Sequence, residues 1–324
     1  PKDGVLMLAC TSKGCLEAAK TAHPGALRTT IRSMCASIPL LIWSSSLPGP
    51  LTWELKKSKI KQMSKTGPFE LIRAAAAAGS IEVLCFLHGS GIELDGPECA
   101  AAALYGHLHV VQFLRSLGCP WYNCTCWSAA KGGHIDVLKW AHENGCDWDY
   151  YTCWHAARGG HLDCLKYAHE NGCPWNLVTC EAAAQGGHID CLRYAHEKGC
   201  LWDERICAGA AINGHLGCLV YARANGCPWD EDTCAYAAEG GRIEILKWAR
   251  NKGCPWDEWT CLSAAQGGHL EILKWARKKG CDWDKSACMN VAKRMPIEFR
   301  GFNCPPPYWG NHLDVLDWIR AQPD

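Results

Sequence analysis

The sequence lacks the features that mark two large classes of protein. No stretch approaches the roughly 20 apolar residues of a transmembrane helix, since the apolar run Ile38–Trp43 is far shorter. The chain also lacks net charge, with 33 basic and 33 acidic residues. Nucleic acid binding needs a broad basic face, which a neutral chain does not provide. We therefore expect no transmembrane segment and no nucleic acid partner.

Motifs of the common enzyme classes are missing as well. The sequence contains no Gly-rich phosphate loop, no H-E-x-x-H and no G-x-S-x-G, which are the segments that hold phosphates, catalytic zinc and a nucleophilic serine. A thiol enzyme needs one cysteine that a nearby base activates, and nothing singles out one of the 24 cysteines. We predict that the protein is not an enzyme and holds no cofactor.

What the sequence does contain is a unit of 27 residues that recurs along most of its length. Two cysteine columns and one tryptophan column keep this step: Cys99, Cys126, Cys153, Cys180, Cys207, Cys234, Cys261 and Cys288; Cys119, Cys146, Cys173, Cys200, Cys227, Cys254 and Cys281; Trp121, Trp148, Trp175, Trp202, Trp229, Trp256 and Trp283. A fixed period of this size is typical of a solenoid, in which units too small to fold alone stack into one core.

Each unit reads as a helix, a tight turn, a second helix and a loop. In residues 150–176 the first helix is expected over about 152–158, with Thr152 as its N-cap. Gly159 and Gly160 then allow the chain to reverse, and a second helix follows over about 161–171. The even recurrence of tryptophan in the loop predicts a packing role for its ring.

The chain at this point resembles the ankyrin repeat family. The resemblance rests on A-A-K-G-G-H-I-D-V-L (129–138) and A-A-Q-G-G-H-L-E-I-L (264–273), and it covers residues 67–324. The standard unit has about 33 residues, so the chain looks like the short variant with a C-P-W-D linker found in algal, protist and large-virus proteins. The resemblance implies an all-α, ankyrin-type solenoid of about nine helical hairpins with shortened inter-repeat loops, because the family's β-hairpin is missing.

The ends of the chain depart from the repeat. Residues 1–66 carry 10 Lys/Arg but only 3 Asp/Glu and form an irregular basic segment, in which 11–38 match a degenerate repeat. This segment is interpreted either as leftover targeting sequence or as a basic docking arm. In the last repeat, an inserted loop at about 294–311 includes the Pro-rich residues 304–309. That loop either caps the final tryptophans or contacts a partner.

The many cysteines are predicted to be reduced, buried thiols. Cysteines of one column sit on successive helices, which pack roughly 8–10 Å apart, whereas a disulfide needs Cα atoms within roughly 7 Å. We therefore expect a reducing intracellular compartment, either the cytoplasm or, if the source is photosynthetic, the plastid stroma. Zinc is also not expected, because the nearest pattern, Cys124, Cys126 and His134, lacks the spacing of a structural site.

A histidine column in the turn between the two helices is interpreted as structural. Its members are His107, His134, His161, His188, His215 and His269. Arg242 interrupts the column, which a capping role tolerates and a catalytic array does not.

Residues that vary from repeat to repeat are the candidates for contact with a partner. The candidate partner-binding residues are Tyr122, Trp127, Lys131, Tyr150, Tyr151, Trp154, His155, Arg158, Tyr236 and Trp259. Aromatic residues and arginine dominate binding hot spots, so the third and fourth repeats, 122–158, are the predicted principal contact. The alternative is that Trp127 and Trp154 merely fill the space left by the missing hairpins.

The predicted function is therefore a non-catalytic protein–protein interaction scaffold. It would act as an adaptor or as a linker subunit of a larger assembly, and it would bind one or more proteins through the concave face of the repeats. An acidic surface on a multi-subunit complex would meet the basic N-terminal segment. A thiol-rich metal-binding or redox protein is the alternative.

Overall fold

The computed structural model describes residues 68–89, 91–293 and 310–323, and every regular element in these ranges is an α-helix. The helices form nine hairpins, which confirms the predicted all-α, ankyrin-type architecture. The predicted basic segment 1–66 and nearly all of the inserted loop lie outside the described residues. Two compact units divide the chain: unit 1 comprises residues up to Thr152 together with Lys166–Cys173, and unit 2 comprises Cys153–Leu165 and the chain from Pro174 onwards.

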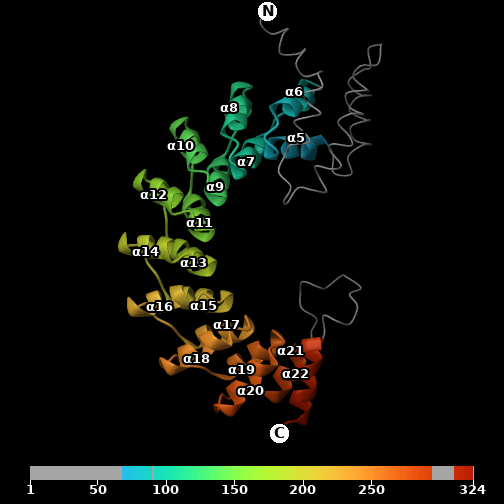
Figure 1. Cartoon of the computed structure of the whole chain (residues 1–324), viewed down its shortest axis with the longest axis vertical. Coiled ribbons are helices and arrows are strands. Elements are labelled where there is room, and N and C mark those ends of the chain that lie inside the picture. The colour runs from blue at the N-terminus through green and yellow to red at the C-terminus, as the bar shows by residue number, and fades with distance from the viewer. Residues whose placement is uncertain (1–67, 90, 294–309, 324) are drawn as a thin grey trace, which may run out of the picture. The chain divides into compact units, whose positions relative to one another are not determined.

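Unit 1 contains a row of first helices and a row of second helices (Figure 1). The first helices are α5 (Pro68–Ala77), α7 (Pro97–Leu104) and α9 (Asn123–Gly132), and the second helices are α6 (Ile81–Gly89), α8 (Leu108–Ser116) and α10 (Ile135–Glu143). Next in the chain come α11 (Tyr150–Gly159) and α12 (Leu162–Glu170), which contribute residues to both units.

Unit 2 repeats the same arrangement. Its first helices are α13 (Leu177–Gly186), α15 (Glu204–Asn213), α17 (Glu231–Glu239), α19 (Glu258–Gln266) and α21 (Lys285–Ala292), and its second helices are α14 (Ile189–Glu197), α16 (Leu216–Ala224), α18 (Ile243–Asn251), α20 (Leu270–Lys278) and α22 (Gly310–Ala321). Neighbouring first helices pack closely (Figure 1), because buried alanines such as Ala237 and Ala238 let the backbones approach.

In the repeats that begin with α11, α13, α15, α19 and α21, an Asp or Asn at the end of the linker, and not the threonine, caps the first helix. Asn176 Oδ1 accepts a hydrogen bond of 3.1 Å from the backbone N–H of Val178, and Asp149 Oδ1 accepts one of 3.0 Å from Tyr151. Helix α11 accordingly begins at Tyr150, and Thr152 is buried inside it. The N-cap predicted at Thr152 was therefore wrong, because an Asx side chain stood within reach of the same N–H groups.

Members of the histidine column connect successive repeats within a unit. In unit 1, His134 Nε2 donates to the carbonyl oxygen of Leu104 at 3.1 Å, and in unit 2, His269 Nε2 donates to that of Glu239 at 2.9 Å. Arg242 makes the same contact, with its Nε 3.2 Å from the carbonyl oxygen of Ile212. The predicted structural role of the column is confirmed. The bond also returns in the last repeat, where His312 Nε2 donates to Gln266 at 3.1 Å.

This ring explains a glycine in the preceding turn. Gly106 has φ +76°, and a Cβ atom built on it would lie 2.5 Å from Nδ1 of His134. The turn therefore needs glycine both for its left-handed backbone and for the space that the imidazole occupies.

The two cysteine columns meet in the core. The Sγ atoms of Cys99 and Cys119 lie 3.7 Å apart in unit 1, and those of Cys207 and Cys227 lie 3.8 Å apart in unit 2. This approach between columns was not considered in the sequence analysis, which compared only cysteines of the same column. Both columns are buried, and the described cysteines are free thiols.

A hydrogen bond accounts for cysteine in the second column. Cys200 Sγ donates to the carbonyl oxygen of Asn176 at 3.1 Å, and Cys227 Sγ donates to that of Asp203 at 3.2 Å. Each acceptor belongs to the residue that caps a first helix. Alanine would fill this space but would leave the carbonyl without its donor.

The tryptophan column fills the space between adjacent second helices. In unit 2, Trp229 lies between Arg223 of α16, whose guanidinium carbon is 4.1 Å from the ring centroid, and Trp248 of α18, whose ring is edge-on at 6.0 Å. Trp202 lies in the same way between His196, stacked at 3.7 Å, and Tyr221 at 6.3 Å. The tryptophan rings are half-buried, so the packing role predicted for them is confirmed without full burial.

Replacing Trp175 by alanine should lower the free energy of unfolding by about 3 kcal/mol, the low end of the range for a buried aromatic ring. The reason is the loss of its half-buried packing, including its edge-on contact with Tyr194 at 6.1 Å. Urea denaturation followed by circular dichroism measures the change. Trp259→Ala is the matched control, because that ring is 59% exposed and its loss should cost under about 0.5 kcal/mol. Equal losses in the two variants would contradict the packing role.

The core thiols should react slowly with Ellman's reagent in the native protein. Burial, with a smaller contribution from Asp163, raises the pKa of Cys164 to about 12, and the neighbouring Cys146 together with burial raises the pKa of Cys126. Thiols such as these two form little thiolate at neutral pH, and the other core thiols are shielded from the reagent by burial, so we expect reaction at least about a hundredfold slower than for free cysteine.

The measurement is best made on a variant in which Cys10, Cys15, Cys35 and Cys304, which lie outside the described residues, are changed to serine. Guanidinium chloride should then release the full set of fast-reacting thiols. Rapid modification of most thiols before denaturation would contradict the buried, protonated state.

Candidate binding surface

The candidate residues of unit 1 lie at the start and on the exposed side of first helices. Tyr122 immediately precedes α9 and is 54% exposed, and Tyr151 in α11 is 45% exposed. The ring of Tyr150 packs on that of Tyr151 with centroids 4.2 Å apart. Lys131 is exposed, whereas Trp127 is half-buried. Unit 1 thus presents two tyrosine rings and a lysine to solvent on its first helices.

The candidate residues of unit 2 begin with a cluster on α11. The rings of Trp154 and His155 meet edge-on at 4.6 Å, and the guanidinium of Arg158 lies 5.7 Å from the centroid of Trp154. Arg158 also donates a hydrogen bond to Oε1 of Gln185. Trp154 and His155 are half-buried, while Arg158 is exposed.

Tyr236 and Trp259 lie on two further first helices of unit 2. Tyr236 on α17 is 40% exposed and Trp259 on α19 is 59% exposed. We use the term first-helix face for the exposed sides of the first helices within a unit, and all the candidate residues lie on or beside it.

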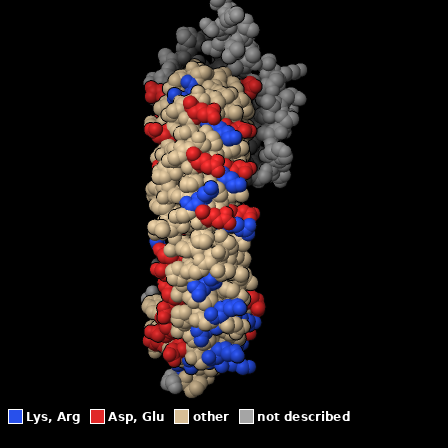
Figure 2. Space-filling model, turned by 90° about the vertical axis from the view of Figure 1, so that its left-hand side faces the viewer, with Lys and Arg blue, Asp and Glu red and all other residues tan. Residues whose placement is uncertain are grey.

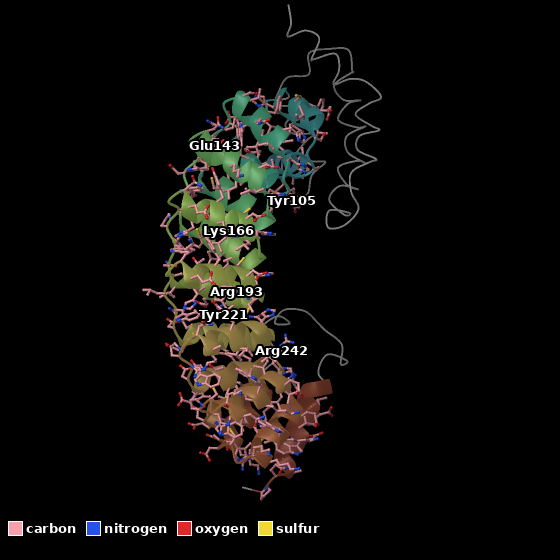
Figure 3. All side chains as sticks on the ribbon, turned by 60° about the vertical axis from the view of Figure 1, so that its left-hand side comes forward. Tyr105, Glu143, Lys166, Arg193, Tyr221 and Arg242 are labelled. Atoms are coloured by element: carbon pink, nitrogen blue, oxygen red, sulfur yellow. The ribbon has the colours of Figure 1, made fainter. Side chains whose placement is uncertain are left out.

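The second helices present a different, repetitive surface. Acid and base alternate there (Figure 2), as in the ion pairs Glu244–Lys247 at 2.9 Å and Glu271–Lys274 at 3.1 Å. Arg193 instead extends over the ring of Tyr221, 5.8 Å from its centroid (Figure 3). Exposed pairs of this kind contribute at most about 1 kcal/mol each. Because nearly the same ion pairs recur from repeat to repeat, the surface of the second helices has few features that could select one partner protein over another.

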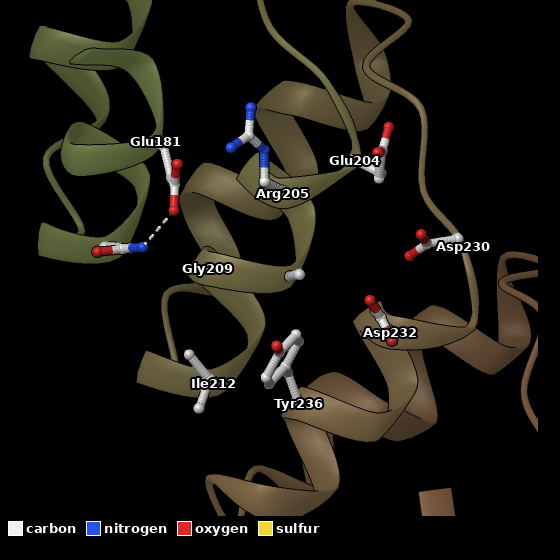
Figure 4. Close-up of a pocket in the computed structure, with 10 residues that line it drawn as sticks. Glu181, Glu204, Arg205, Gly209, Ile212, Asp230, Asp232 and Tyr236 are labelled. Carbon is white, nitrogen blue, oxygen red and sulfur yellow. Dashed lines mark hydrogen bonds between the residues drawn. The ribbon is translucent and has the colours of Figure 1, made fainter. Parts of the chain in front are cut away.

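A groove opens on the first-helix face of unit 2 (Figure 4). Its volume is about 380 Å³. The lining residues come from α13, α15, α17 and the linker before α17: Glu181, Gln185, Glu204, Arg205, Ala208, Gly209, Ile212, Asp230, Asp232 and Tyr236.

Small residues on α15 create this groove. Ala208 and Gly209, both buried, line the groove from α15 at positions where α13 carries Glu181 and α17 carries Tyr236. A Cβ atom at Gly209 would lie 2.8 Å from Cγ of Gln185, so the floor has no room for a larger residue unless Gln185 moves. Tyr236 forms the opposite wall (Figure 4).

The groove is acidic. Glu181, Glu204, Asp230 and Asp232 contribute four carboxylates to its lining, against one guanidinium. That guanidinium, of Arg205, already pairs with Asp203 at 2.8 Å. Burial, followed by the charge of Asp232 and other nearby carboxylates, raises the pKa of Asp230. The carboxylates therefore repel one another, and the charge of Arg205, which also attracts Glu181 and Glu204, offsets this repulsion only in part.

Sequence reasoning identified Tyr236 as a candidate residue but missed the groove. The available signal was the succession of variable positions, in which two small residues on one helix stand between large residues on its neighbours. The depth of the groove, however, depends on how far the flanking side chains project, and the repeat pattern alone does not give this distance.

Metal ligands do not converge in the described residues. No group of three or more His, Cys, Asp or Glu side chains there is placed to hold a metal ion. In the same ranges, no helix combines the length and the apolar character needed to cross a bilayer.

Comparison with known proteins agrees with the repeated hairpins. A family model described as ankyrin repeats (many copies) matches residues 126–169 and again residues 153–196. None of the curated proteins matches the chain. Among solved structures, the human ASB11 ankyrin repeat domain is similar at 18% identity, covering 61% of this chain and 99% of its own, with a TM-score of 0.43. Residues 126–196 are thus similar to ankyrin repeats, and the helical hairpin that they form recurs throughout both units.

Proposed function

We propose that the chain is a non-catalytic protein–protein interaction scaffold, an adaptor or a linker subunit of a larger assembly, that binds through its first-helix face. Ankyrin repeats generally mediate protein–protein interaction, and the family is typically non-enzymatic. The observation that carries the proposal is the contrast between the two surfaces. Charged residues recur on the second helices, whereas the first helices expose different aromatic and charged residues in each repeat.

Exposed aromatic rings are the strongest support for binding on this face. Tyr122 and Tyr151 in unit 1, and Tyr236 and Trp259 in unit 2, all remain 40% exposed or more. Large apolar rings that face water favour association when a complementary surface is offered. We propose that the principal contact residues belong to the third and fourth repeats, and that Trp154 and Arg158 of the fourth repeat are among them.

The partner is proposed to be one or more proteins in a reducing compartment. Free thiols in the core are compatible with such a compartment and would be at risk of oxidation elsewhere. The basic residues 1–66 would add a contact to an acidic surface on the assembly. Thiol-based metal or redox chemistry is not favoured, because burial raises the pKa of core thiols such as Cys164 and Cys191 and no group of three or more metal-ligating side chains converges in the described residues.

The double substitution Trp154→Ala and Arg158→Ala tests the principal contact. If these side chains form a hot spot, the amount of protein that copurifies with the full chain under gentle conditions should fall about tenfold or more. Mass spectrometry with isotope labelling quantifies the copurifying polypeptides.

The control for this test is Glu244→Ala with Lys247→Ala, which removes an exposed pair from a second helix and should leave copurification unchanged. Both variants must give the circular dichroism spectrum of the parent. Undiminished copurification with the Trp154/Arg158 variant would show that these residues are not part of the contact. An equal loss of copurifying protein in both variants would argue against binding on the first-helix face.

A further inference from the structure

We propose that the groove between α13, α15 and α17 receives an arginine side chain from an extended segment of the partner protein. This inference rests on the protein-binding function proposed above and specifies the chemistry of one contact. It concerns unit 2 alone, since every residue that lines the groove belongs to that unit.

Charge complementarity selects a cation. Apart from the pair between Arg205 and Asp203, no ion pair is formed among the described residues of the groove. Glu204 and Asp232, both exposed in the first turns of their helices, form no ion pair, and Glu204 is attracted only at longer range by Arg205, which is already paired with Asp203. A ligand cation placed between them would relieve their repulsion and gain attraction from both.

Asp230 supplies a further acceptor at the end of the groove. The equivalent Asp203 and Asp257 each accept a hydrogen bond from the backbone N–H two residues later, at 3.1 and 3.0 Å. Asp230 makes no such cap bond, and its Oδ1 atom is buried without a hydrogen-bond partner. An unsatisfied buried acceptor is costly, and a donor from the ligand would satisfy it.

The shape of the groove favours arginine over lysine. Tyr236 offers the face of an aromatic ring beside the carboxylates (Figure 4). A planar guanidinium can stack on such a ring while it donates two parallel hydrogen bonds to a carboxylate, which an ammonium group cannot do.

The volume of the groove favours an extended segment over a single free amino acid. A volume of about 380 Å³ exceeds what one side chain needs, and Ala208 and Gly209 keep the floor low along α15. The backbone of a partner segment can therefore approach α15 while its arginine lies against Tyr236.

The test uses the full chain and fluorescein-labelled peptides of alternating serine and arginine, with citrulline and lysine analogues as probes. Fluorescence anisotropy at about 0.05 M salt, where charge attraction is weakly screened, gives the dissociation constants. We expect the arginine peptide to bind at least about tenfold more tightly than its citrulline analogue, which has nearly the same shape but no charge, and more tightly than the lysine peptide.

A matched pair of variants locates the site. Glu204→Gln with Asp232→Asn removes two charges from the groove and should weaken binding of the arginine peptide about tenfold or more. Glu231→Gln with Glu258→Gln removes two charges from the first turns of α17 and α19, outside the lining, and should change the affinity less than about twofold. Tyr236→Leu should reduce the preference for arginine over lysine.

Three results would overturn the proposal: equal binding of arginine and citrulline peptides, equal losses in the two charge variants, or tighter binding of a peptide with the sequence of residues 55–65. The last result would assign the groove to the chain's own lysine-rich segment. If these tests fail while the partner still copurifies through Trp154 and Arg158, only the arginine groove is lost and the proposed function stands.

Discussion

A side-chain N–H at the start of a second helix donates to a carbonyl oxygen at the end of the first helix of the repeat before it. The rest of the structure depends on this contact. His134, His269 and Arg242 all make it, although their side chains differ in shape. The bond satisfies a carbonyl that the end of a helix would otherwise leave unpaired. It also ties each repeat to its neighbour at the turn, so that successive hairpins within a unit take the same register.

Two further contacts maintain that register on either side of the turn. The thiol of the second cysteine column holds the cap of the preceding first helix, and the tryptophan of the same linker fills the space between second helices. The residues of the core, the turn and the linker therefore all serve to pack one repeat against the next. Only the exposed positions of the first helices remain free to differ, and these positions carry the aromatic rings and the acidic groove.

The repeat period was sufficient to predict the hairpins, because a step of 27 residues with paired glycines between two helical segments allows few other folds. The tryptophan packing and the structural histidines followed from their even recurrence. Other features depend on distances that sequence does not contain. Thr152 was assigned as a cap because its type is suitable, but Asp149 stood closer to the free N–H groups. The approach of Cys99 and Cys119, 20 residues apart, to 3.7 Å between their sulfur atoms does not follow from the 27-residue step, which relates only cysteines of the same column. The groove above Gly209 arises from a missing side chain, and its depth depends on the reach of Gln185 and Tyr236.

The stability of the variants His269→Arg and His269→Ala tests the inter-repeat bond most directly. At about pH 8, arginine should keep the free energy of unfolding within about 0.5 kcal/mol of the parent, as Arg242 does in its own repeat, whereas alanine should lose about 1–3 kcal/mol. Burial lowers the pKa of His269 in the folded protein, so the unfolded chain binds a proton at this residue more readily than the folded protein does. The free energy of unfolding of the parent should therefore fall as the pH drops below about 6.5. The arginine variant should lose less over that interval, because arginine does not titrate there. An alanine variant as stable as the parent, or an arginine variant as weak as alanine, would contradict this account.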